Sequence, residues 1–152
     1  VVAHPSGEHR GGSAVIRSGL VDHITPEVAA RANGLLAAGA ANLLQIRSVG
    51  GAVNDVAADA MAYPHRTQNF SLTAAGSRGR AELLDGQWGD LRPLLKGMYL
   101  NFETDTHPDR LVEAFPEPTL SRLRALKRRY DPDNVFNLNF AIEPQESIRA
   151  AS

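Results

Sequence analysis

The chain has 152 residues, of which 43% are hydrophobic and 22% are charged, a composition typical of one folded domain with a real core. Its formal net charge of -1 argues against a general electrostatic attraction to nucleic acid. No apolar run approaches the roughly 18 residues that a membrane span requires, so we expect a soluble, cytoplasmic protein. Because the sequence contains no cysteine, disulfides, thiolate metal sites and cysteine nucleophiles are excluded.

Short apolar segments along the chain predict strands, and a glycine pair interrupts them. The candidate strands are residues 14–17, 42–49, 68–75 and 97–102. Gly50 and Gly51 should break or bend the second one, because glycine tolerates backbone conformations that other residues avoid. Residues 1–12, which are rich in Gly, His and Pro, predict a loop.

Two helices are predicted between these strands. Thr25 is a good N-cap and Pro26 fits the first helical position, so a helix should begin there. Its predicted inner residues are Val28, Ala32, Leu35 and Leu36. A second helix should cover residues 81–91, where Leu84, Trp88 and Leu91 share one face. Strands and helices in this irregular order predict an α+β fold, an antiparallel sheet of about four or five strands with helices packed on one face.

The last part of the chain predicts a helix, a turn and an extended tail. Residues 103–118 form an acidic connection with a helical turn expected around residues 111–115. The next helix should dock through a stripe made of Leu120, Leu123, Leu126 and Tyr130. It should stop near Tyr130, because Asp131 precedes a proline. In the extended tail that follows, one face should be apolar, with Phe136, Leu138, Phe140 and Ile142.

This closing stretch resembles the end of the berberine-bridge-enzyme-like flavoproteins, FAD-linked oxidases whose chains end in a motif of the form RLxxLKxxYDPxNxFxxNxxI. The matching residues are Arg122, Leu123, Leu126, Lys127, Tyr130, Asp131, Pro132, Asn134, Phe136, Asn139 and Ile142. A well-capped helix with a turn would explain two or three of these residues, but not the whole series in order. Two further segments match the family in the correct order: Gly50-Gly51 followed by Tyr63-Pro64-His65-Arg66, and Tyr99-Leu100-Asn101-Phe102.

The resemblance implies a domain organisation. Residues 1–105 would be part of a substrate-binding domain of the FAD-linked oxidase C-terminal type. Residues 106–152 would be the berberine-like helix and tail that complete an FAD domain absent from this chain. The sequence contains no Gly-rich phosphate loop, so FAD would be bound mainly by that other domain. The implied partners are this FAD domain, on the same or a separate polypeptide, and a small-molecule substrate.

The same resemblance implies roles for individual residues. Tyr99 is the candidate for handling the substrate proton, and with an ordinary pKa of about 10 it needs a neighbouring cation or second phenol to act as a base. Asn101, which strand alternation places on the same face, and Asn139 in the tail are the candidate cofactor-side amides. A half-buried structural tyrosine and a structural cap remain the alternative roles for Tyr99 and Asn139.

The polar face of the strands is expected to line the substrate pocket. Its candidate substrate-binding residues are Gln45, Arg47 and Thr73, with an ordinary surface strand face as the alternative for the first two. We interpret His65 and Arg66 mainly as a structural pair at a strand entrance. The remaining histidines show no spacing that suits a metal site.

The implied function is the substrate-side part of an FAD-dependent oxidoreductase. It would oxidise an alcohol, sugar or amine-type carbon by hydride transfer to flavin, and it would be inactive without the FAD domain. One alternative is a stand-alone, non-catalytic ligand-binding domain that dimerises through the apolar surface an FAD domain would otherwise cover. Another is one half of a split flavoenzyme.

Overall fold

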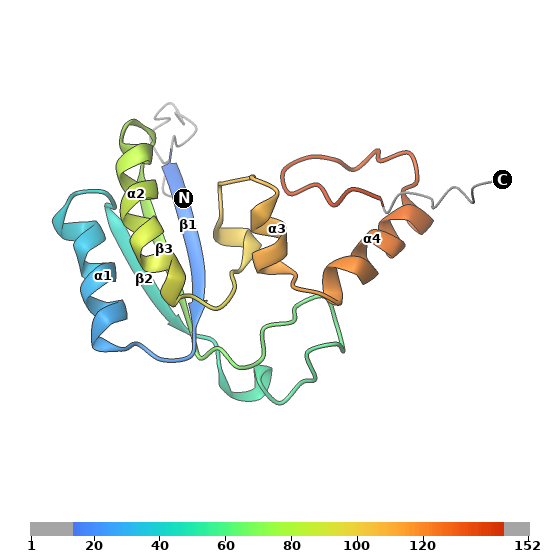
Figure 1. The fold of residues 1–152 in the computed structure, drawn as a ribbon, viewed down its shortest axis with the longest axis horizontal. Coiled ribbons are helices and arrows are strands. Elements are labelled where there is room, and N and C mark those ends of the chain that lie inside the picture. Colours follow the sequence, from blue (N-terminus) through green and yellow to red (C-terminus); the bar gives the residue numbers. More distant parts are fainter. Residues whose placement is uncertain (1–13, 145–152) are drawn as a thin grey trace, which may run out of the picture.

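The computed structural model describes residues 14–144, so the loop expected for residues 1–12 lies outside the described part of the chain. Its centre is a three-stranded antiparallel sheet in the order β1-β3-β2 (Figure 1). The strands are β1 (Ala14–Val21), β2 (Leu43–Ser48) and β3 (Phe70–Ser77). The α+β class is confirmed, but the sheet has three strands in the described residues rather than four or five.

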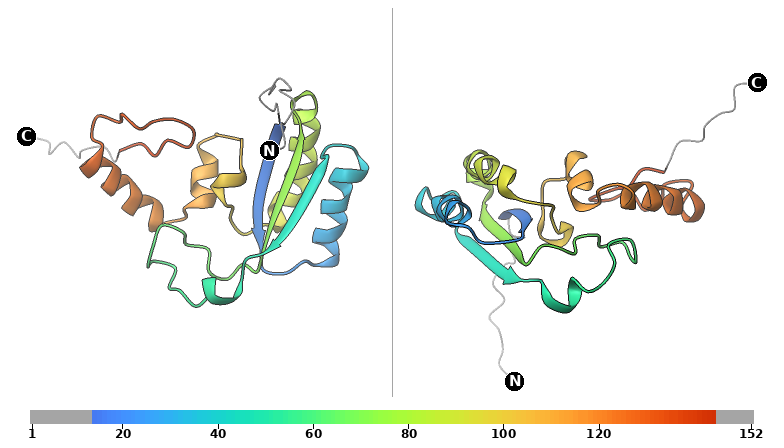
Figure 2. Two further views of the ribbon diagram at one scale, coloured as in Figure 1. Left: turned by 180° about the vertical axis from the view of Figure 1, so that it is seen from behind. Right: turned by 60° about the horizontal axis from the view of Figure 1, so that its bottom comes forward.

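Two helices cover one face of the sheet, as Figures 1 and 2 show. α1 (Pro26–Ala37) begins as predicted, because the Thr25 hydroxyl accepts a hydrogen bond of 3.2 Å from the backbone N–H of Val28. α2 (Ala81–Leu91) buries the predicted Leu84, Trp88 and Leu91. Leu36 was expected on the inner face of α1 and is 40% exposed instead.

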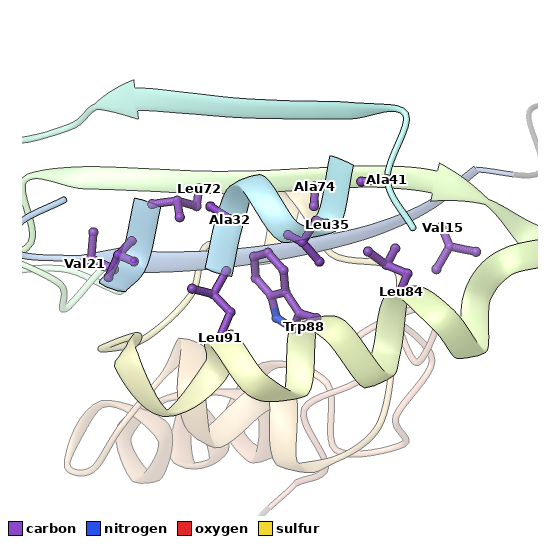
Figure 3. Close-up of a cluster of buried hydrophobic side chains, with 11 residues drawn as sticks. Val15, Val21, Ala32, Leu35, Ala41, Leu72, Ala74, Leu84, Trp88 and Leu91 are labelled. Carbon is purple, nitrogen blue, oxygen red and sulfur yellow. The ribbon is translucent and has the colours of Figure 1, made fainter. Parts of the chain in front are cut away.

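The hydrophobic core lies between these helices and the sheet (Figure 3). Its largest members are Leu35, Leu72, Leu84, Trp88 and Leu91, each at most 3% exposed. Successive strand residues point to opposite faces of a sheet. Because Leu72 and Ala74 of β3 face the helices, the residues between and beside them face the other way. The sheet therefore has one closed, apolar face and one open face.

A short irregular segment takes the place of the predicted fourth strand along the free edge of β1. The N–H of Leu20 donates to the carbonyl of Gly97 at 2.9 Å, and the N–H of Thr104 donates to the carbonyl of Ile16 at 3.1 Å. The five residues 16–20 of β1 thus face the eight residues 97–104 of this segment, and the excess bulges outward as the 3₁₀ turn η4 (Leu100–Phe102). The prediction of a strand over residues 97–102 is wrong, because these residues include a 3₁₀ turn. The segment nevertheless lies along β1, where a fourth strand would be. We call residues 97–104 the edge bulge.

The remaining elements are short and lie outside the central layer. They are η1 (Gly51–Val53), η2 (Arg78–Arg80), η3 (Arg92–Leu94), α3 (Asp109–Ala114) and α4 (Thr119–Tyr130). α4 and the tail project away from the sheet (Figure 2). Among the described residues, no helix has the length and apolarity needed to cross a membrane.

The predicted docking stripe of α4 is buried only at its start. Leu120 is 2% exposed, whereas Leu126 is 42% and Tyr130 is 71% exposed. The helix is confirmed and ends at Tyr130, but most of its apolar stripe has no cover within the described residues.

After α4 the tail folds back into a hook. The Asp131 carboxylate accepts hydrogen bonds from the backbone N–H groups of Val135 and Phe136, at 2.8 and 3.0 Å, and pairs with Lys127. The hydrogen bond from Lys127 lowers the pKa of Asp131 below its ordinary value. The tail is not a strand, because Asn139 has a φ of 55° and interrupts the alternation. Its predicted apolar face is therefore lost.

Candidate active site on the open face of the sheet

A pocket of about 540 Å³ opens on the side of the sheet that the helices leave uncovered. It lies between the ends of the strands, the loop that follows β2 and the edge bulge. We call it the aromatic pocket. Its lining residues are Leu20, Arg47, Ser48, Val49, Val53, Met61, Tyr63, Arg66, Ser71, Tyr99 and Phe102. Mainly apolar walls with a few polar groups are typical of small-molecule sites.

Three aromatic rings form one wall of this pocket. Tyr63 packs edge-on against Tyr99 with ring centroids 6.0 Å apart, and Tyr99 packs against Phe102 at 5.8 Å. Burial raises the pKa of the Tyr63 hydroxyl, although the positive charge of Arg66 opposes that rise. The rings come from two distant segments, so the wall exists only when the edge bulge is seated against the loop after β2.

Tyr99 carries the polar group of this wall. It is 37% exposed, and its hydroxyl oxygen accepts a hydrogen bond of 2.8 Å from the side-chain amide of Asn101. The 3₁₀ turn, rather than strand alternation, brings these two residues together. A donated hydrogen bond stabilises negative charge on an oxygen, so the pair is suited to a proton acceptor.

Two arginines flank the aromatic wall. The Arg47 guanidinium lies over the Phe102 ring, 4.4 Å from its centroid, and the Arg66 guanidinium lies 5.2 Å from the centroid of Tyr63. Both distances are typical of cation–π contacts. Tyr63 therefore gives Tyr99 a second phenol, and Arg66 places a cation in the same wall. Either kind of neighbour can support a tyrosine that acts as a base.

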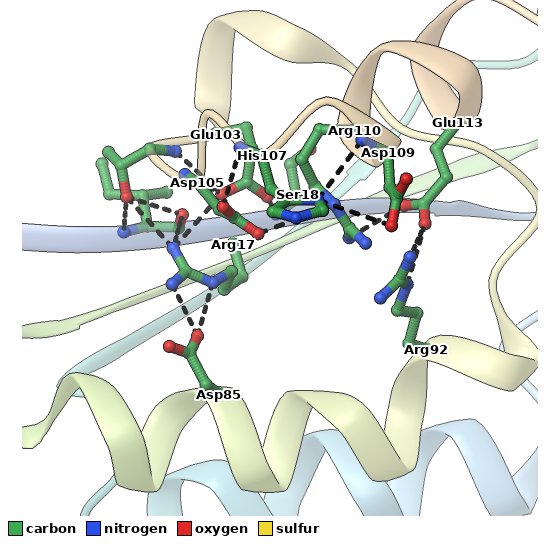
Figure 4. A network of polar contacts seen from close by, with 12 residues as sticks. Arg17, Ser18, Asp85, Arg92, Glu103, Asp105, His107, Asp109, Arg110 and Glu113 are labelled. Carbon is green, nitrogen blue, oxygen red and sulfur yellow. Dashed lines mark hydrogen bonds and ion pairs between the residues drawn. The ribbon is translucent and has the colours of Figure 1, made fainter.

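A buried charge network fixes the edge bulge to the sheet (Figure 4). The Glu103 carboxylate accepts hydrogen bonds from the backbone N–H groups of Ser18, Thr104 and Asp105 and from the Arg17 guanidinium. The bond to Ser18 replaces the backbone partner that the bulge removes from β1. Burial raises the pKa of Glu103, while these amides and the Arg17 charge oppose the rise.

The network continues from the bulge to the helices. Arg17 also pairs with Asp85 of α2, with Nε and Oδ1 2.7 Å apart. Arg110 of α3 is 5% exposed and pairs with Glu113 at 3.0 Å. Glu113 in turn pairs with Arg92. Arg17 thus connects the edge bulge to α2. Arg110 connects α3 to Asp105 just after the bulge, and Glu113 connects α3 to η3.

His65 packs edge-on behind Tyr63 of the aromatic wall, with ring centroids 5.5 Å apart. It is 6% exposed, and its Nε2 donates a hydrogen bond of 3.0 Å to the carbonyl of Ala114. Burial lowers the pKa of His65. Its ring lies where a side chain at Gly97 would be, and Gly97 has a φ of 106°. This geometry favours the structural interpretation of His65.

A second pocket, of about 580 Å³, lies between the edge bulge and the tail. Its lining residues are Leu100, Asn101, Glu103, Thr104, Thr106, Leu138, Asn139 and Phe140. We call it the amide pocket, because it brings together the two amides that the sequence suggested for the cofactor, Asn101 and Asn139.

The six residues suggested by the sequence thus fall into three groups. Arg47 and Tyr99 line the aromatic pocket, and Asn101 bonds to Tyr99 while also lining the amide pocket with Asn139. Gln45 and Thr73 are cross-strand partners on the open face, but they do not line either pocket. Thr73 is 5% exposed, so a bound molecule in the aromatic pocket would not reach it directly.

Sequence reasoning missed Tyr63 and Phe102 as wall residues and gave Arg66 only a structural role. One signal was present for Tyr63. It is a large aromatic residue that follows a loop of mainly small and polar residues, so no neighbour in the sequence can bury its ring. No comparable local signal marks Phe102 as part of the same wall.

Comparison with known proteins agrees with this geometry. Residues 98–143 match the family described as berberine and berberine-like. The solved structure of Physcomitrella patens BBE-like 1 is 19% identical, with a TM-score of 0.76 over 90% of this chain and 31% of that one. Berberine bridge enzyme from Eschscholzia californica is 16% identical, with a TM-score of 0.71 over 88% of this chain and 33% of that one.

A third similar structure is a xylooligosaccharide oxidase from Myceliophthora thermophila C1. It is 24% identical, with a TM-score of 0.67 over 88% of this chain and 33% of that one. No curated protein matches the sequence. The chain thus spans about one third of the length of the solved structures it matches.

The fold of this chain, with its sheet, edge bulge and berberine-like segment, is thus similar to about one third of each of these solved structures. These similarities confirm the resemblance found in the sequence: residues 98–143 match the berberine and berberine-like family, and the fold is similar to that of solved berberine-bridge-enzyme-like structures.

Proposed function

We propose that this chain is the C-terminal, substrate-side part of an FAD-dependent oxidoreductase. Residues 1–105 would form part of the substrate-binding domain, and residues 106–152 would complete an FAD domain supplied by other residues. The substrate would be an alcohol, a sugar or an amine that is oxidised at carbon by hydride transfer. Similarity to solved oxidases and the berberine-like segment support this proposal.

The observation that carries the proposal is the Tyr99–Asn101 pair at the wall of the aromatic pocket. Tyr99 lines the pocket and is 37% exposed, and its phenol oxygen accepts a hydrogen bond from the Asn101 amide. A substrate hydroxyl or amine within reach of this oxygen would lose its proton to it as the neighbouring carbon is oxidised. The wall formed by Tyr63 and Phe102 would orient the substrate and exclude water from one side.

The residues present fit the ring part of a flavin rather than the whole cofactor. The amide pocket combines the amides of Asn101 and Asn139 with the apolar side chains of Leu100 and Leu138, and a flat ring with a polar edge requires such a mixture. FAD would supply the hydride acceptor when bound. Its pyrophosphate would be held outside this chain, whose sequence has no Gly-rich phosphate loop.

The test is the substitution Tyr99→Phe in the full enzyme that carries this chain. Phenylalanine keeps the ring packed against Tyr63 and Phe102 and removes only the oxygen. We expect the rate of flavin reduction by substrate, measured by stopped-flow absorbance, to fall by a factor of about 10² to 10⁴, the range for general acid–base groups. Tyr63→Phe is the comparison: it removes the second phenol but keeps the oxygen that accepts the proton, so its loss should be smaller than that of Tyr99→Phe. Unchanged flavin reduction in Tyr99→Phe would remove the proposed role.

The exposed apolar tail favours a covering partner. Val135, Phe136 and Leu138 are 70%, 82% and 84% exposed, which is unusual for three apolar side chains close together. An FAD domain, on the same or a separate polypeptide, is the partner that the family similarity supports. A second copy of the chain is the alternative. Sedimentation of the 152-residue chain separates the two, since a dimer that Phe136→Asp dissociates would favour the second copy.

A further inference from the structure

We infer that the aromatic pocket binds a small molecule that carries a carboxylate, with Arg66 and Arg47 as its counter-charges. The inference rests on the proposed function in one respect: it takes this molecule to be the substrate. It narrows the substrate from any alcohol, sugar or amine to an acid.

Arg66 has an unused binding edge. Its Nη1 donates to the Val53 carbonyl at 2.9 Å, whereas its Nε and Nη2 are buried and have no hydrogen-bond partner among the described residues. Nε and Nη2 lie on one edge of the guanidinium, and two parallel N–H groups on one edge match the two oxygens of a carboxylate. Buried donors without partners are rare and unfavourable. A carboxylate in the pocket would reach these two atoms by a turn of the guanidinium toward it, and it would then remove the deficit.

Two buried arginines elsewhere in the chain have the carboxylate partners that the pocket arginines lack. Arg17 and Arg110 are 7% and 5% exposed, and each pairs with carboxylates. Within residues 14–144, neither Arg66 nor Arg47 forms an ion pair with a carboxylate; both stack on aromatic rings instead. Arg66 is partly buried and Arg47 is exposed at the pocket, and the described chain gives neither of them a carboxylate as counter-charge.

The other lining residues of the aromatic pocket also favour an anionic ligand. None of its described lining residues is acidic, and its other polar side chains are the hydroxyls of Ser48 and Ser71 and the phenols of the tyrosines. Two guanidinium groups in a largely apolar pocket attract an anion and repel a protonated amine. The aromatic rings offer their surfaces to the apolar body of the ligand. The pocket therefore suits a compact acid with an apolar or aromatic body.

The inference is tested by titrating the 152-residue chain with two isosteric probes, phenylacetate and phenylacetamide. Binding is followed through the ¹⁵N–¹H spectrum, in which the amide signals near Arg47 and Ser71 should move. We expect phenylacetate to bind about tenfold or more tightly than the amide, because a charge-assisted pair contributes more than a neutral one. The difference should shrink as salt is added. Equal affinities, or no binding of phenylacetate, would overturn the inference.

Variants locate the site. Arg66→Met and Arg47→Met should each weaken phenylacetate about tenfold and leave phenylacetamide nearly unchanged. Arg66→Lys keeps the charge but loses the two-pronged edge, so its loss should be intermediate. Arg78→Met, at the opposite end of β3, is the matched control and should bind as the unmodified chain does. Because Arg47 is exposed and bonds to no backbone group, Arg47→Met remains informative if Arg66→Met disturbs the loop. Unchanged binding in Arg47→Met and Arg66→Met would overturn the assignment.

These titrations contain no flavin, so they are independent of the oxidase test. Selective binding of phenylacetate together with unchanged flavin reduction in Tyr99→Phe would retain the acid site and reject the proposed catalytic role. Equal binding of both probes together with a slow Tyr99→Phe enzyme would retain the oxidase and reject the acid.

Discussion

The two halves of the chain are stabilised in different ways. The N-terminal layer of β1–β3, α1 and α2 closes a continuous apolar core, in which Leu35, Leu84 and Leu91 are fully buried. The C-terminal half, from the edge bulge to the tail, is held by ion pairs and hydrogen bonds to charged groups, such as Glu103 with Arg17 and Asp131 with Lys127. Few of its large apolar side chains are fully buried, and Val135, Phe136 and Leu138 of the tail are exposed.

This difference shows what each half does. A layer that buries its own apolar residues needs no partner for stability. The hook fixes its backbone with polar contacts and leaves Phe136 and Leu138 exposed, and under the proposed function an FAD domain would cover them. The aromatic pocket lies where the two halves meet, since Ser71 comes from the sheet and Tyr99 from the edge bulge.

The largest expected effect comes from making the same substitution in both halves. Leu84→Ala removes a side chain that is 0% exposed and should lower the free energy of unfolding by about 2–5 kcal/mol. Leu138→Ala removes one that is 84% exposed and should change it by less than about 0.5 kcal/mol. Urea unfolding followed by fluorescence of Trp88, the single tryptophan, measures both. Similar losses in the two variants would mean that the tail is part of the core.

A second prediction concerns the packing of Gly97, the first residue of the edge bulge, against His65. Gly97→Ala places a methyl group on the His65 ring and forces alanine to a φ of 106°, so we expect a loss of about 1–3 kcal/mol or more. Gly86→Ala in α2 is the control, because its Cβ meets nothing within 4 Å and alanine favours a helix. That variant should gain about 0.5–1 kcal/mol. Equal behaviour of the two alanines in urea would contradict the packing of His65 under Gly97.

Local rules predicted the self-contained half well. The Thr25 cap, the α2 stripe and the position of Arg47 on the polar face of its strand follow from chemistry within a few residues, and all three are present. The edge bulge could not be predicted in this way. Alternation in residues 97–102 indicates a strand, but the bulge depends on Glu103 reaching Ser18 across the chain. Such a contact leaves no periodic signal.

The residues of the candidate site also differ in how far the sequence predicts them. Tyr99 and Arg47 could be singled out from the sequence, because a resemblance and a strand face each named them. The pairing of Tyr99 with Asn101 was expected from alternation and arises from a 3₁₀ turn instead. The positions of the Tyr63 ring and of the unpaired Nε and Nη2 of Arg66 depend on how the loop after β2 folds over the sheet. The direction of one side chain in such a loop is set by tertiary contacts, which the sequence alone does not show.

The smallest predicted effect is a pH dependence at the joint between the halves. Burial lowers the pKa of His65 in the folded chain below its ordinary value of 6.5. The unfolded chain therefore binds a proton more readily, and the stability that His65 contributes is present above that pH and lost as the pH falls. Between about pH 7.5 and 5.5, the free energy of unfolding should fall with a slope of at most about 1.4 kcal/mol per pH unit from this group.

His65→Gln isolates this contribution, because glutamine can still donate to the Ala114 carbonyl but does not titrate. Its unfolding free energy, measured in urea at several pH values, should vary less between about pH 7.5 and 5.5 than that of the unmodified chain. His23→Gln removes an exposed imidazole and should keep the original slope. If His65→Gln kept it as well, protonation at the joint would not weaken the fold. The two halves would then be connected mainly by the Glu103 network, whose raised pKa acts in the opposite direction, since a carboxyl with a raised pKa stabilises the folded chain at low pH.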